Sequence, residues 1–249
     1  ANPILSLYEV NRQLQMRDGA AAERTRVIPN GIDIRRLAPL RAKRPTSPPP
    51  ILCLLGRVVP IKDISTFIRA MRTVVNRLPE AEGWIVGTLD EDQEYAEECR
   101  NLVETLGLTG KVKFMGHRKI DDILPKVGLL VLSSISEGLP LVILEGFAAG
   151  VPAVSTDVGA CRQLIYGAGE EEDDVGSAGE VVGLANPTAL AEAVLSLLTD
   201  PAKWQAAQAV AIRRVETLYS QERMMASYRT VYEEALASWP VSALSSAKS

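Results

Sequence analysis

The sequence predicts an α/β fold, a doubly wound parallel sheet of the Rossmann-like kind. Short apolar runs alternate with segments of helical period along most of the 249 residues. Each run is apolar throughout, as expected of strands that helices cover on both faces. Because crossovers between parallel strands are right-handed, successive helices then cover both faces of one sheet.

Short apolar runs and the helical segments between them define the predicted elements in order. The strands are expected at residues 51–56, 83–87, 111–116, 128–134, 151–156 and 179–183. The helices, which are amphipathic or end at a glycine, are expected at residues 63–78, 91–107, 120–127, 140–150 and 160–167. Strand and helix therefore alternate throughout the predicted core.

The segment before the core is expected to be less regular. Residues 4–19 are predicted to form a helix, and a separate short strand is predicted at residues 26–30. Residues 39–50 (PLRAKRPTSPPP) are rich in proline and basic, which is typical of a linker with extended character.

The segment after the core is expected to be mostly helical. Residues 201–239 are predicted to form a nearly continuous helix. The acidic, glycine-rich segment 167–179 is interpreted as a solvated surface loop, and residues 241–249 as a disordered tail.

Composition argues against several classes of protein. A net charge of -4 and 5% aromatic residues favour neither nucleic-acid binding nor binding to an anionic membrane surface. No apolar run approaches membrane-spanning length, and no signal-peptide pattern opens the chain. Cys53, Cys99 and Cys161 are far apart and odd in number, which argues against disulfide and zinc sites. We therefore expect small buried thiols in a reducing cytoplasm.

Two glutamates, Glu137 and Glu145, flank the start of the helix predicted at 140–150. Pro140 is typical of a first helical turn, so Glu137 precedes the helix and Glu145 lies about 7 Å along its axis. Carboxylates bind vicinal hydroxyls, and a helix N-terminus binds phosphate. The alternative is that Glu137 complements the helix dipole and Glu145 faces solvent. However, the helix is apolar nearly all round, so a carboxylate buried there needs a ligand or an internal donor.

A second candidate site follows the first core strand, in GRVVPIKDI. Gly56 permits a turn or the close approach of a ligand, while Arg57 and Lys62 carry the charges that bind a diphosphate. Both cations lie where a strand leads into a helix, at the carboxyl edge of the sheet. Taken alone, they are better explained as surface cations that aid solubility.

In combination, these patterns resemble the retaining glycosyltransferases of the GT-B fold (glycosyl transferases group 1), specifically their C-terminal, nucleotide-sugar-binding half. The resemblance rests on G-R-x-x-P-x-K-D at 56–63, E-x7-E from Glu137, and VIPNGID at 27–33, and it covers residues 27–235. Segments such as GLLVLSSISEGLPLVILEGFAAGVPAVSTDVGACRQLI and NRQLQMRDGA resemble, within that family, enzymes of exopolysaccharide synthesis.

The resemblance implies a role for each candidate residue. Arg57 and Lys62 would bind the diphosphate, Glu137 the hydroxyls of the transferred sugar, and Glu145 those of the ribose. Backbone groups would complete the site, near Gly56, Gly138, Leu139, Leu141 and Val142 for the phosphates and sugar, and near His117 and Arg118 for the base. The implied donor is a UDP-sugar, UDP-glucose above all, without a metal cofactor. The anomeric configuration would be retained, with the leaving phosphate assisting the acceptor.

The resemblance also implies that a second domain is needed. Residues 1–30 would be the end of an N-terminal GT-B domain, residues 31–219 the donor-binding domain, and residues 220–249 a crossing helix and tail. We expect the isolated chain to bind a UDP-sugar weakly and to transfer nothing. The missing N-terminal domain and a membrane-bound polysaccharide synthesis machinery are the expected partners. No nucleic-acid partner is expected.

Other patterns are weaker. Many relatives carry a glutamate where Gln163 stands here, so no catalytic role is assigned to that position. Asp90-Glu91-Asp92 matches a metal-binding D-x-D pattern, but Asp90 is interpreted as the cap of the helix at 91–107. His117 is the single histidine and has no neighbours for a triad. A non-catalytic nucleotide- or partner-binding module and, less well supported, a nucleotide-sugar epimerase stay open as alternatives.

Overall fold

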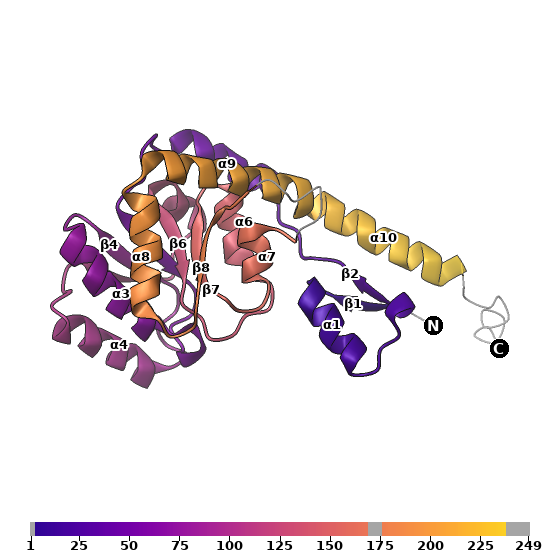
Figure 1. Ribbon diagram of the computed structural model, residues 1–249, viewed down its shortest axis with the longest axis horizontal. Helices are drawn as coiled ribbons and strands as arrows, with labels where there is room; N and C mark the ends of the chain where they lie inside the picture. The colour runs from indigo at the N-terminus through magenta and orange to yellow at the C-terminus, as the bar shows by residue number, and fades with distance from the viewer. Residues whose placement is uncertain (1–2, 169–175, 238–249) are drawn as a thin grey trace.

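A computed structural model describes residues 3–168 and 176–237 (Figure 1). At its centre is a six-stranded sheet in the order β5-β4-β3-β6-β7-β8, and every neighbouring pair is parallel. The strands are β3 (Ile51–Leu55), β4 (Glu82–Val86), β5 (Val112–Gly116), β6 (Leu129–Leu132), β7 (Ala153–Thr156) and β8 (Gly179–Val182). The predicted doubly wound parallel sheet and its six strands are confirmed.

Helices cover both faces of the sheet. One face packs against α3 (Ile64–Arg77), α4 (Gln93–Thr105) and α8 (Pro187–Leu198). The other packs against α5 (Ile120–Ile123), η4 (Leu124–Lys126), α6 (Leu141–Ala148) and α7 (Cys161–Tyr166). Figure 1 shows α3 and α8 on one side of the strands and α6 and α7 on the other. Side chains of β3 alternate between the two cores, because Leu52 and Leu54 face the first and Cys53 the second.

The strand order reverses beside β3. From β3 the chain moves outward to β4 and β5, and it then returns to β6 on the opposite side of β3. In open α/β sheets, ligands bind outside the carboxyl ends of the strands at such a switch point. The loops that follow β3 and β6 therefore mark the expected ligand site.

The predicted helix at residues 4–19 is partly wrong. The structure places β1 (Ile4–Ser6) ahead of α1 (Glu9–Arg17), followed by η1 (Ala22–Arg24). β1 pairs in parallel with β2 (Thr25–Val27), the strand predicted at 26–30. β1 is extended because it pairs with a strand about twenty residues later in the chain. The helical periodicity of residues 4–19 does not indicate that pairing.

The predicted extended linker at 39–50 is also partly wrong. Its first half is helical, with α2 (Ile34–Leu37) continuing into η2 (Ala38–Lys43). Leu37 and Leu40 are buried, and Arg41 Nε donates to the Ala148 carbonyl oxygen at 2.7 Å. Proline is tolerated in a first helical turn, so Pro39 does not prevent this helix.

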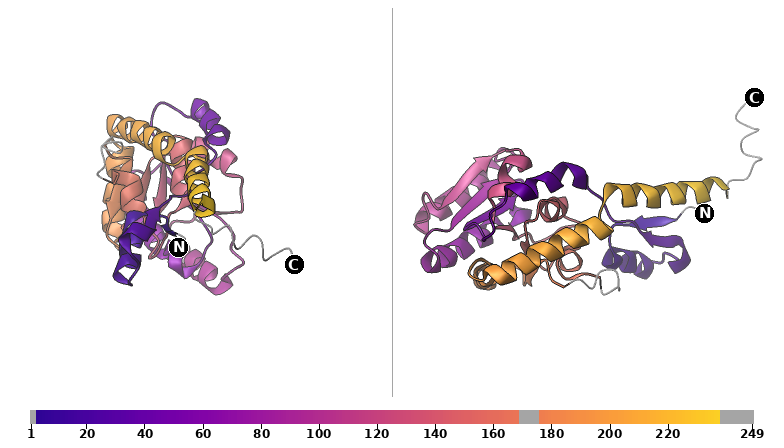
Figure 2. Two further views of the ribbon diagram at one scale, coloured as in Figure 1. Left: turned by 90° about the vertical axis from the view of Figure 1, so that its right-hand side faces the viewer. Right: turned by 90° about the horizontal axis from the view of Figure 1, so that it is seen from above.

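The predicted helix at 201–239 is interrupted. It consists of α9 (Pro201–Leu218) and α10 (Gln221–Ala237), which are separated by Tyr219 and Ser220. There Ile32 donates to the Tyr219 carbonyl oxygen and accepts from the Gln221 N–H, both at 2.9 Å, so a distant strand-like contact breaks the helix. Beyond the break α10 runs beside β1 and β2 (Figure 2), where Arg26 and Glu234 form a 2.7 Å ion pair.

The helix α8, which covers one face of the sheet, was not among the predicted elements.

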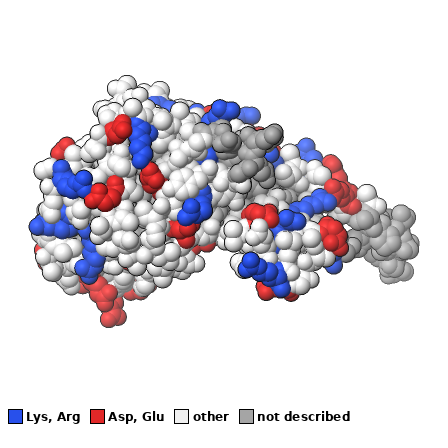
Figure 3. Space-filling view, in the orientation of Figure 1, with Lys and Arg blue, Asp and Glu red and all other residues white. Residues whose placement is uncertain are grey.

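The predicted tail at 241–249 and most of the predicted acidic loop lie outside the described residues. No helix in the described part of the chain is long and apolar enough to cross a membrane. Cys53, Cys99 and Cys161 are free and buried, as expected. Figure 3 shows basic and acidic side chains interspersed over one face, without a continuous basic patch there.

Candidate functional site

The loops after β3 and β6 meet at the switch point. The first contains η3 (Pro60–Lys62), and the second leads from Ser133 to the start of α6. Ser133 Oγ donates to the Lys62 carbonyl oxygen at 2.9 Å, and the Ile135 N–H donates to the Ile61 carbonyl oxygen at 3.0 Å. The two loops that carry most of the predicted site are thus joined directly.

A cavity of about 300 Å³ opens at this edge of the sheet. Its lining comes from the ends of β3, β4 and β5, the loops that follow them, and the helices α5 and α6. The structure brings together there six residues that the sequence predicted separately, namely Gly56, Arg57, His117, Arg118, Val142 and Glu145. The loops after β3 and β5 and the helix α6 therefore place these six residues around one cavity, whereas the other predicted residues, Lys62, Glu137, Gly138, Leu139 and Leu141, are not part of its lining.

Glycines allow the backbone to approach closely beneath this cavity. Gly87 follows β4 and donates to the Gly116 carbonyl oxygen at 3.0 Å. A Cβ on Gly87 would collide with the backbone of Gly56. These three glycines end β3, β4 and β5 side by side, and the lack of a side chain at Gly87 lets the ends of β3 and β4 stay in contact.

Lys62 and Glu137 bind each other in the structure. Lys62 Nζ lies 2.7 Å from Glu137 Oε1, and Ser134 Oγ donates to the same oxygen at 2.6 Å. The two side chains are 20% and 11% exposed, so this ion pair is largely shielded from water. The resemblance assigned them to different parts of a ligand, whereas here they form one polar cluster beside the N-terminus of α6.

A second loop, which connects β7 to α7, packs against the loop that carries Glu137. The Ala160 N–H donates to the Gly138 carbonyl oxygen at 2.8 Å. Gly159 has a φ of +53°, and a Cβ there would collide with the carbonyl groups of Glu137 and Gly138. Gly138 itself has open space around the position of a Cβ. The loop is therefore packed on its inner side and open on its outer side.

The N-terminus of α6 presents backbone donors beside this loop. Pro140 is the N-cap residue and accepts a hydrogen bond from the Ile143 N–H at 3.1 Å. Within the described part of the chain, no acceptor takes the N–H groups of Leu141 and Val142. Leu139 is buried in the second core and fixes the turn that leads into the helix. Free N–H groups at a helix start suit a phosphate.

Glu145 is held at the edge of the cavity. Its side chain is 29% exposed, so it is less buried than the apolar surroundings of the helix indicated. Its neighbours Ile143, Leu144 and Phe147 are fully buried. Partial burial raises the pKa of Glu145, Arg36 opposes that rise, and Asp121 adds to it. Glu145 therefore lines the cavity with Arg36 as a neighbouring cation, which at 3.8 Å is not the internal hydrogen-bond donor that the sequence argument named as the alternative to a ligand.

Sequence reasoning missed Arg36, which lies beside the site, as well as Gly87, Thr88 and Ile120, which line the cavity. Arg36 Nη1 lies 2.5 Å from Asp121 Oδ1, and Arg36 Nη2 lies 3.8 Å from Glu145 Oε1. Arg36, Asp121 and Glu145 come from α2, α5 and α6. No local pattern could have joined them, because Arg36 and Asp121 are 85 residues apart.

The D-x-D pattern has two explanations in the structure. Asp92 caps α4, since its Oδ1 accepts from the Tyr95 N–H at 3.0 Å, so the prediction that Asp90 is the cap is wrong. Glu91 forms an ion pair with Arg57. The cap falls at Asp92 because the helix begins at Gln93, two residues later than predicted. No cluster of three or more potential metal ligands occurs in the part of the chain that the structure describes.

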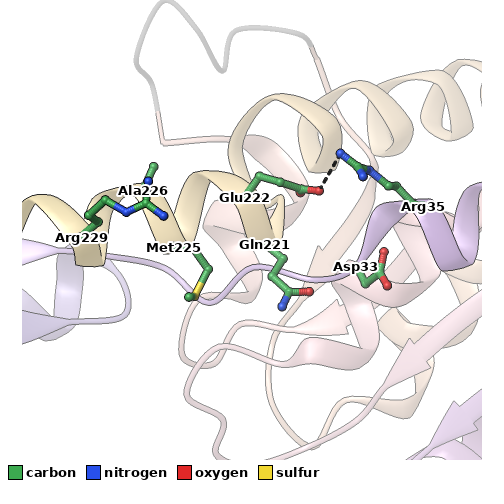
Figure 4. A pocket seen from close by; sticks show the side chains of 7 residues that line it. All are labelled: Asp33, Arg35, Gln221, Glu222, Met225, Ala226 and Arg229. Carbon is green, nitrogen blue, oxygen red and sulfur yellow. Dashed lines mark ion pairs between the residues drawn. The ribbon is translucent and has the colours of Figure 1, made fainter.

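A larger concavity of about 500 Å³ lies between α2 and α10 and contains none of the predicted residues (Figure 4). It is lined by Asp33, Arg35, Gln221, Glu222, Met225, Ala226 and Arg229. Arg35 and Glu222 approach each other at 3.3 Å across it. Gln163 lines a different cavity, beside Tyr219, and does not reach the predicted site.

Comparisons with known proteins agree with this geometry. A family model described as Glycosyl transferases group 1 matches residues 49–200, more than half of the chain. The lipopolysaccharide core biosynthesis mannosyltransferase LpsB of Rhizobium meliloti (strain 1021) is 28% identical over 216 residues, which are 83% of this chain and 60% of LpsB. The chain thus spans about 60% of the length of that curated relative.

Solved structures show the same fold. Anabaena HepE in complex with UDP and glucose has a TM-score of 0.75 and 22% identity, covering 96% of this chain and 64% of HepE. Sucrose-phosphate synthase from Thermosynechococcus elongatus has a TM-score of 0.76 and 24% identity, covering 94% and 58%. At these identities the likeness establishes the GT-B architecture.

Proposed function

Because this chain belongs to the glycosyl transferases group 1 family, we propose that it binds the nucleotide-sugar donor of a retaining glycosyltransferase. The proposed donor is UDP-glucose, and the proposed reaction adds a hexose to a growing exopolysaccharide. The observation that carries the proposal is the cavity at the switch point that Arg57, His117, Arg118 and Glu145 line together. Family membership alone does not identify the ligand, so the proposal rests on the geometry of the site.

The diphosphate is proposed to lie between the cations and the start of α6. Arg57 lines the cavity, and Lys62 lies on the loop joined to Ser133 and Ile135. The N–H groups of Leu141 and Val142 add donors along the positive end of the helix dipole. Arg57 would exchange its partner Glu91 for the diphosphate, and Lys62 and the helix N-terminus would add to the positive charge around it.

The two glutamates are proposed to bind the two hydroxyl-bearing parts of the donor. Glu145, at the cavity edge, would accept from the ribose hydroxyls, and Glu137 would accept from the transferred sugar. Lys62 lies 2.7 Å from Glu137 Oε1, so the same ion pair can contact the phosphate and the sugar where they join. The base would contact main-chain atoms near His117 and Arg118.

Different observations support the base and the sugar of the proposed donor. The HepE structures contain UDP, UDP with glucose, and UDP-glucose. LpsB is named a mannosyltransferase, so another hexose is the main competitor. The segments named in the sequence analysis resemble PelF, the glycosyltransferase of Pel exopolysaccharide synthesis, which favours UDP-glucose and an exopolysaccharide acceptor.

The remaining parts of the reaction are proposed to lie outside this chain. The acceptor would bind an N-terminal GT-B domain, and the complete enzyme would work with a membrane-bound polysaccharide machinery. Residues 31–219 would form the donor domain and α10 would cross toward the missing domain. The three free buried cysteines fit a reducing cytoplasm. No metal is proposed to take part, because Asp92, one of the two aspartates of the D-x-D pattern, caps α4.

Calorimetric titration tests the proposal. The ligands are UDP, UDP-glucose, GDP, GDP-mannose and ADP, each without metal and then with Mg²⁺. Metal-independent binding that prefers UDP and UDP-glucose is the expected result. A preference for GDP-mannose would overturn the assigned donor, and metal-dependent binding would overturn the assigned role of D-x-D. Absence of binding to every nucleotide would favour a partner-binding module of the same fold.

Two variants test the assigned residues. Loss of a hydrogen bond to a charged group costs about 1.5–3 kcal/mol, or roughly ten- to a hundredfold in affinity. Glu145→Ala is expected to weaken UDP and UDP-glucose alike, whereas Glu137→Ala is expected to weaken UDP-glucose and spare UDP. Equal losses for both ligands in both variants would refute the division of roles.

A further inference from the structure

Three charged side chains from three helices form a row at the edge of the proposed donor site. Arg36 lies on α2, Asp121 on α5 and Glu145 on α6. The exposed fractions of their side chains are 45%, 43% and 29%. Glu145 is thus the least exposed of the three, and it is the one that lines the cavity.

The guanidinium of Arg36 lies closer to Asp121 than to Glu145. Its Nη1 lies 2.5 Å from Asp121 Oδ1, which is a charge-assisted hydrogen bond. Its Nη2 lies 3.8 Å from Glu145 Oε1, which is beyond hydrogen-bond reach but close enough for strong Coulomb attraction. Glu145 therefore has a neighbouring positive charge that does not occupy its oxygens.

We propose that Arg36 is a positioning residue that keeps Glu145 ionised as the acceptor for the vicinal hydroxyls of a nucleoside, while Asp121 holds the guanidinium back from the Glu145 oxygens. This inference rests on the proposed function, which assigns the ribose to Glu145. An ionised carboxylate offers both oxygens to two hydroxyl donors, whereas a protonated one has lost part of that capacity. A guanidinium bonded directly to Glu145 would compete with the ligand for the same oxygens.

The electrostatic surroundings show why such a cation is needed. Partial burial raises the pKa of Glu145, Asp121 raises it further, and Arg36 lowers it. The other charged or titratable groups that line the cavity are Arg57, His117 and Arg118. Arg36 is therefore the group whose removal most directly favours the protonated, weaker acceptor.

The first experiment compares Arg36→Gln with Arg35→Gln by calorimetric titration with UDP at pH 5.5 and pH 8. Arg35 is the adjacent residue on α2, is 84% exposed and pairs with Glu222 instead. We expect Arg36→Gln to bind UDP more weakly than wild type at pH 5.5, by up to about tenfold if the acceptor is lost, and nearly as well at pH 8. Arg35→Gln should match wild type at both. Any effect of His117 or of the ligand's own phosphate is common to all three proteins.

The role of Asp121 predicts a different pH profile. Asp121→Asn releases the guanidinium, which can then bond to Glu145 directly. We expect UDP to bind more weakly at both pH values, because the competing contact persists wherever Glu145 is ionised. A 2′,3′-dideoxy analogue of UDP should bind wild type and Arg36→Gln equally at each pH. A loss of affinity for this analogue in Arg36→Gln at pH 5.5 would contradict a role through the ribose hydroxyls.

A measurement without ligand separates this inference from the proposed function. Carbon-13 NMR of the Glu145 carboxyl group, followed against pH, reports its ionisation directly. The titration of Glu145 should move to higher pH in Arg36→Gln and stay in place in Arg35→Gln. An unmoved titration in Arg36→Gln overturns the inference even if UDP binds. Failure of the wild type to bind any nucleotide would instead refute the proposed function.

Discussion

Lys62 Nζ lies 2.7 Å from Glu137 Oε1, and Ser134 Oγ donates to that same carboxylate oxygen at 2.6 Å. The pair joins the loop after β3 to the loop after β6, across the point where the strand order reverses. Both residues were predicted to be ligand contacts, and in the structure each is the other's partner. The ion pair therefore links the stability of the two loops to the proposed binding of the donor.

The first prediction concerns that link. Lys62→Met removes the cation from a carboxylate that is only 11% exposed, which leaves a largely buried charge without its partner. We expect the free energy of unfolding to fall by about 1–3 kcal/mol, measured by urea denaturation. Lys43→Met, at an exposed lysine outside the site, is the matched control and should change stability by less than about 0.5 kcal/mol. Equal stability of the two variants would show that the pair contributes nothing.

A second prediction concerns the two glycines around the Glu137 loop. Gly159→Ala forces a Cβ into the carbonyl groups of Glu137 and Gly138 at a residue with a φ of +53°. The variant should lose about 1–3 kcal/mol of stability and bind UDP-glucose more weakly. Gly138→Ala, where the space is open, should fold as stably as wild type yet bind UDP-glucose more weakly, because the donor is proposed to lie in that open space. Thermal melts and calorimetry together distinguish the pair, and unchanged binding in Gly138→Ala would contradict the ligand placement.

A third prediction concerns a buried cation away from the site. Arg214 is 1% exposed and donates to the carbonyl oxygens of Leu164 and Ile165, at the end of α7, and of Gly176. Arg214→Met leaves these acceptors without their donor, so we expect a loss of about 3 kcal/mol or more. Arg213→Met, one residue earlier and exposed, should be close to neutral. A chemical denaturation series would reject this account if both substitutions had the same small effect.

A fourth prediction is that the ionised carboxylate of Glu145 lowers the stability of the folded protein. Its pKa is raised in the folded protein, first by burial. A raised carboxyl pKa stabilises the fold below the unfolded pKa, and this contribution is lost as pH rises through the folded pKa. Glu145→Gln should therefore raise Tm relative to wild type at pH 7, and the difference should shrink as pH falls through the raised pKa of Glu145 and vanish below the unfolded pKa of about 4.5. For a chain of this size, a change of about 1 kcal/mol in the free energy of unfolding corresponds to a change in Tm of about 2–4 °C. A lower Tm for the variant at pH 7 would contradict the direction of the pKa shift.

The core of the fold was predictable because its signals are local. Apolar runs such as 51–56 and helix ends such as Gly107 and Gly150 each lie within a few residues of the element they define. α8 also had local signals, an Asn186 cap followed by Pro187, and could have been found from them. β1 and the break between α9 and α10 depend on contacts with β2 and Ile32, which no short segment encodes.

The candidate site was predictable to a similar degree and for a related reason. Loops at the carboxyl ends of parallel strands meet at one edge, so Gly56, His117 and Glu145 could be expected together once their strands were assigned. The partners of these residues were not predictable. Arg36 reaches Glu145 from a helix more than 100 residues earlier in the chain, and Glu91 reaches Arg57 from the loop after β4.

Amide chemical-shift mapping by TROSY NMR during titration with UDP-glucose locates the donor site on the molecule. We expect the largest, saturable shifts at Gly56, Arg57, Gly138, Leu141 and Val142. Gln221 and Met225, in the concavity between α2 and α10, should stay unchanged. Shifts confined to that concavity, or the absence of saturable shifts at the carboxyl edge of the sheet, would contradict the assignment of the donor site.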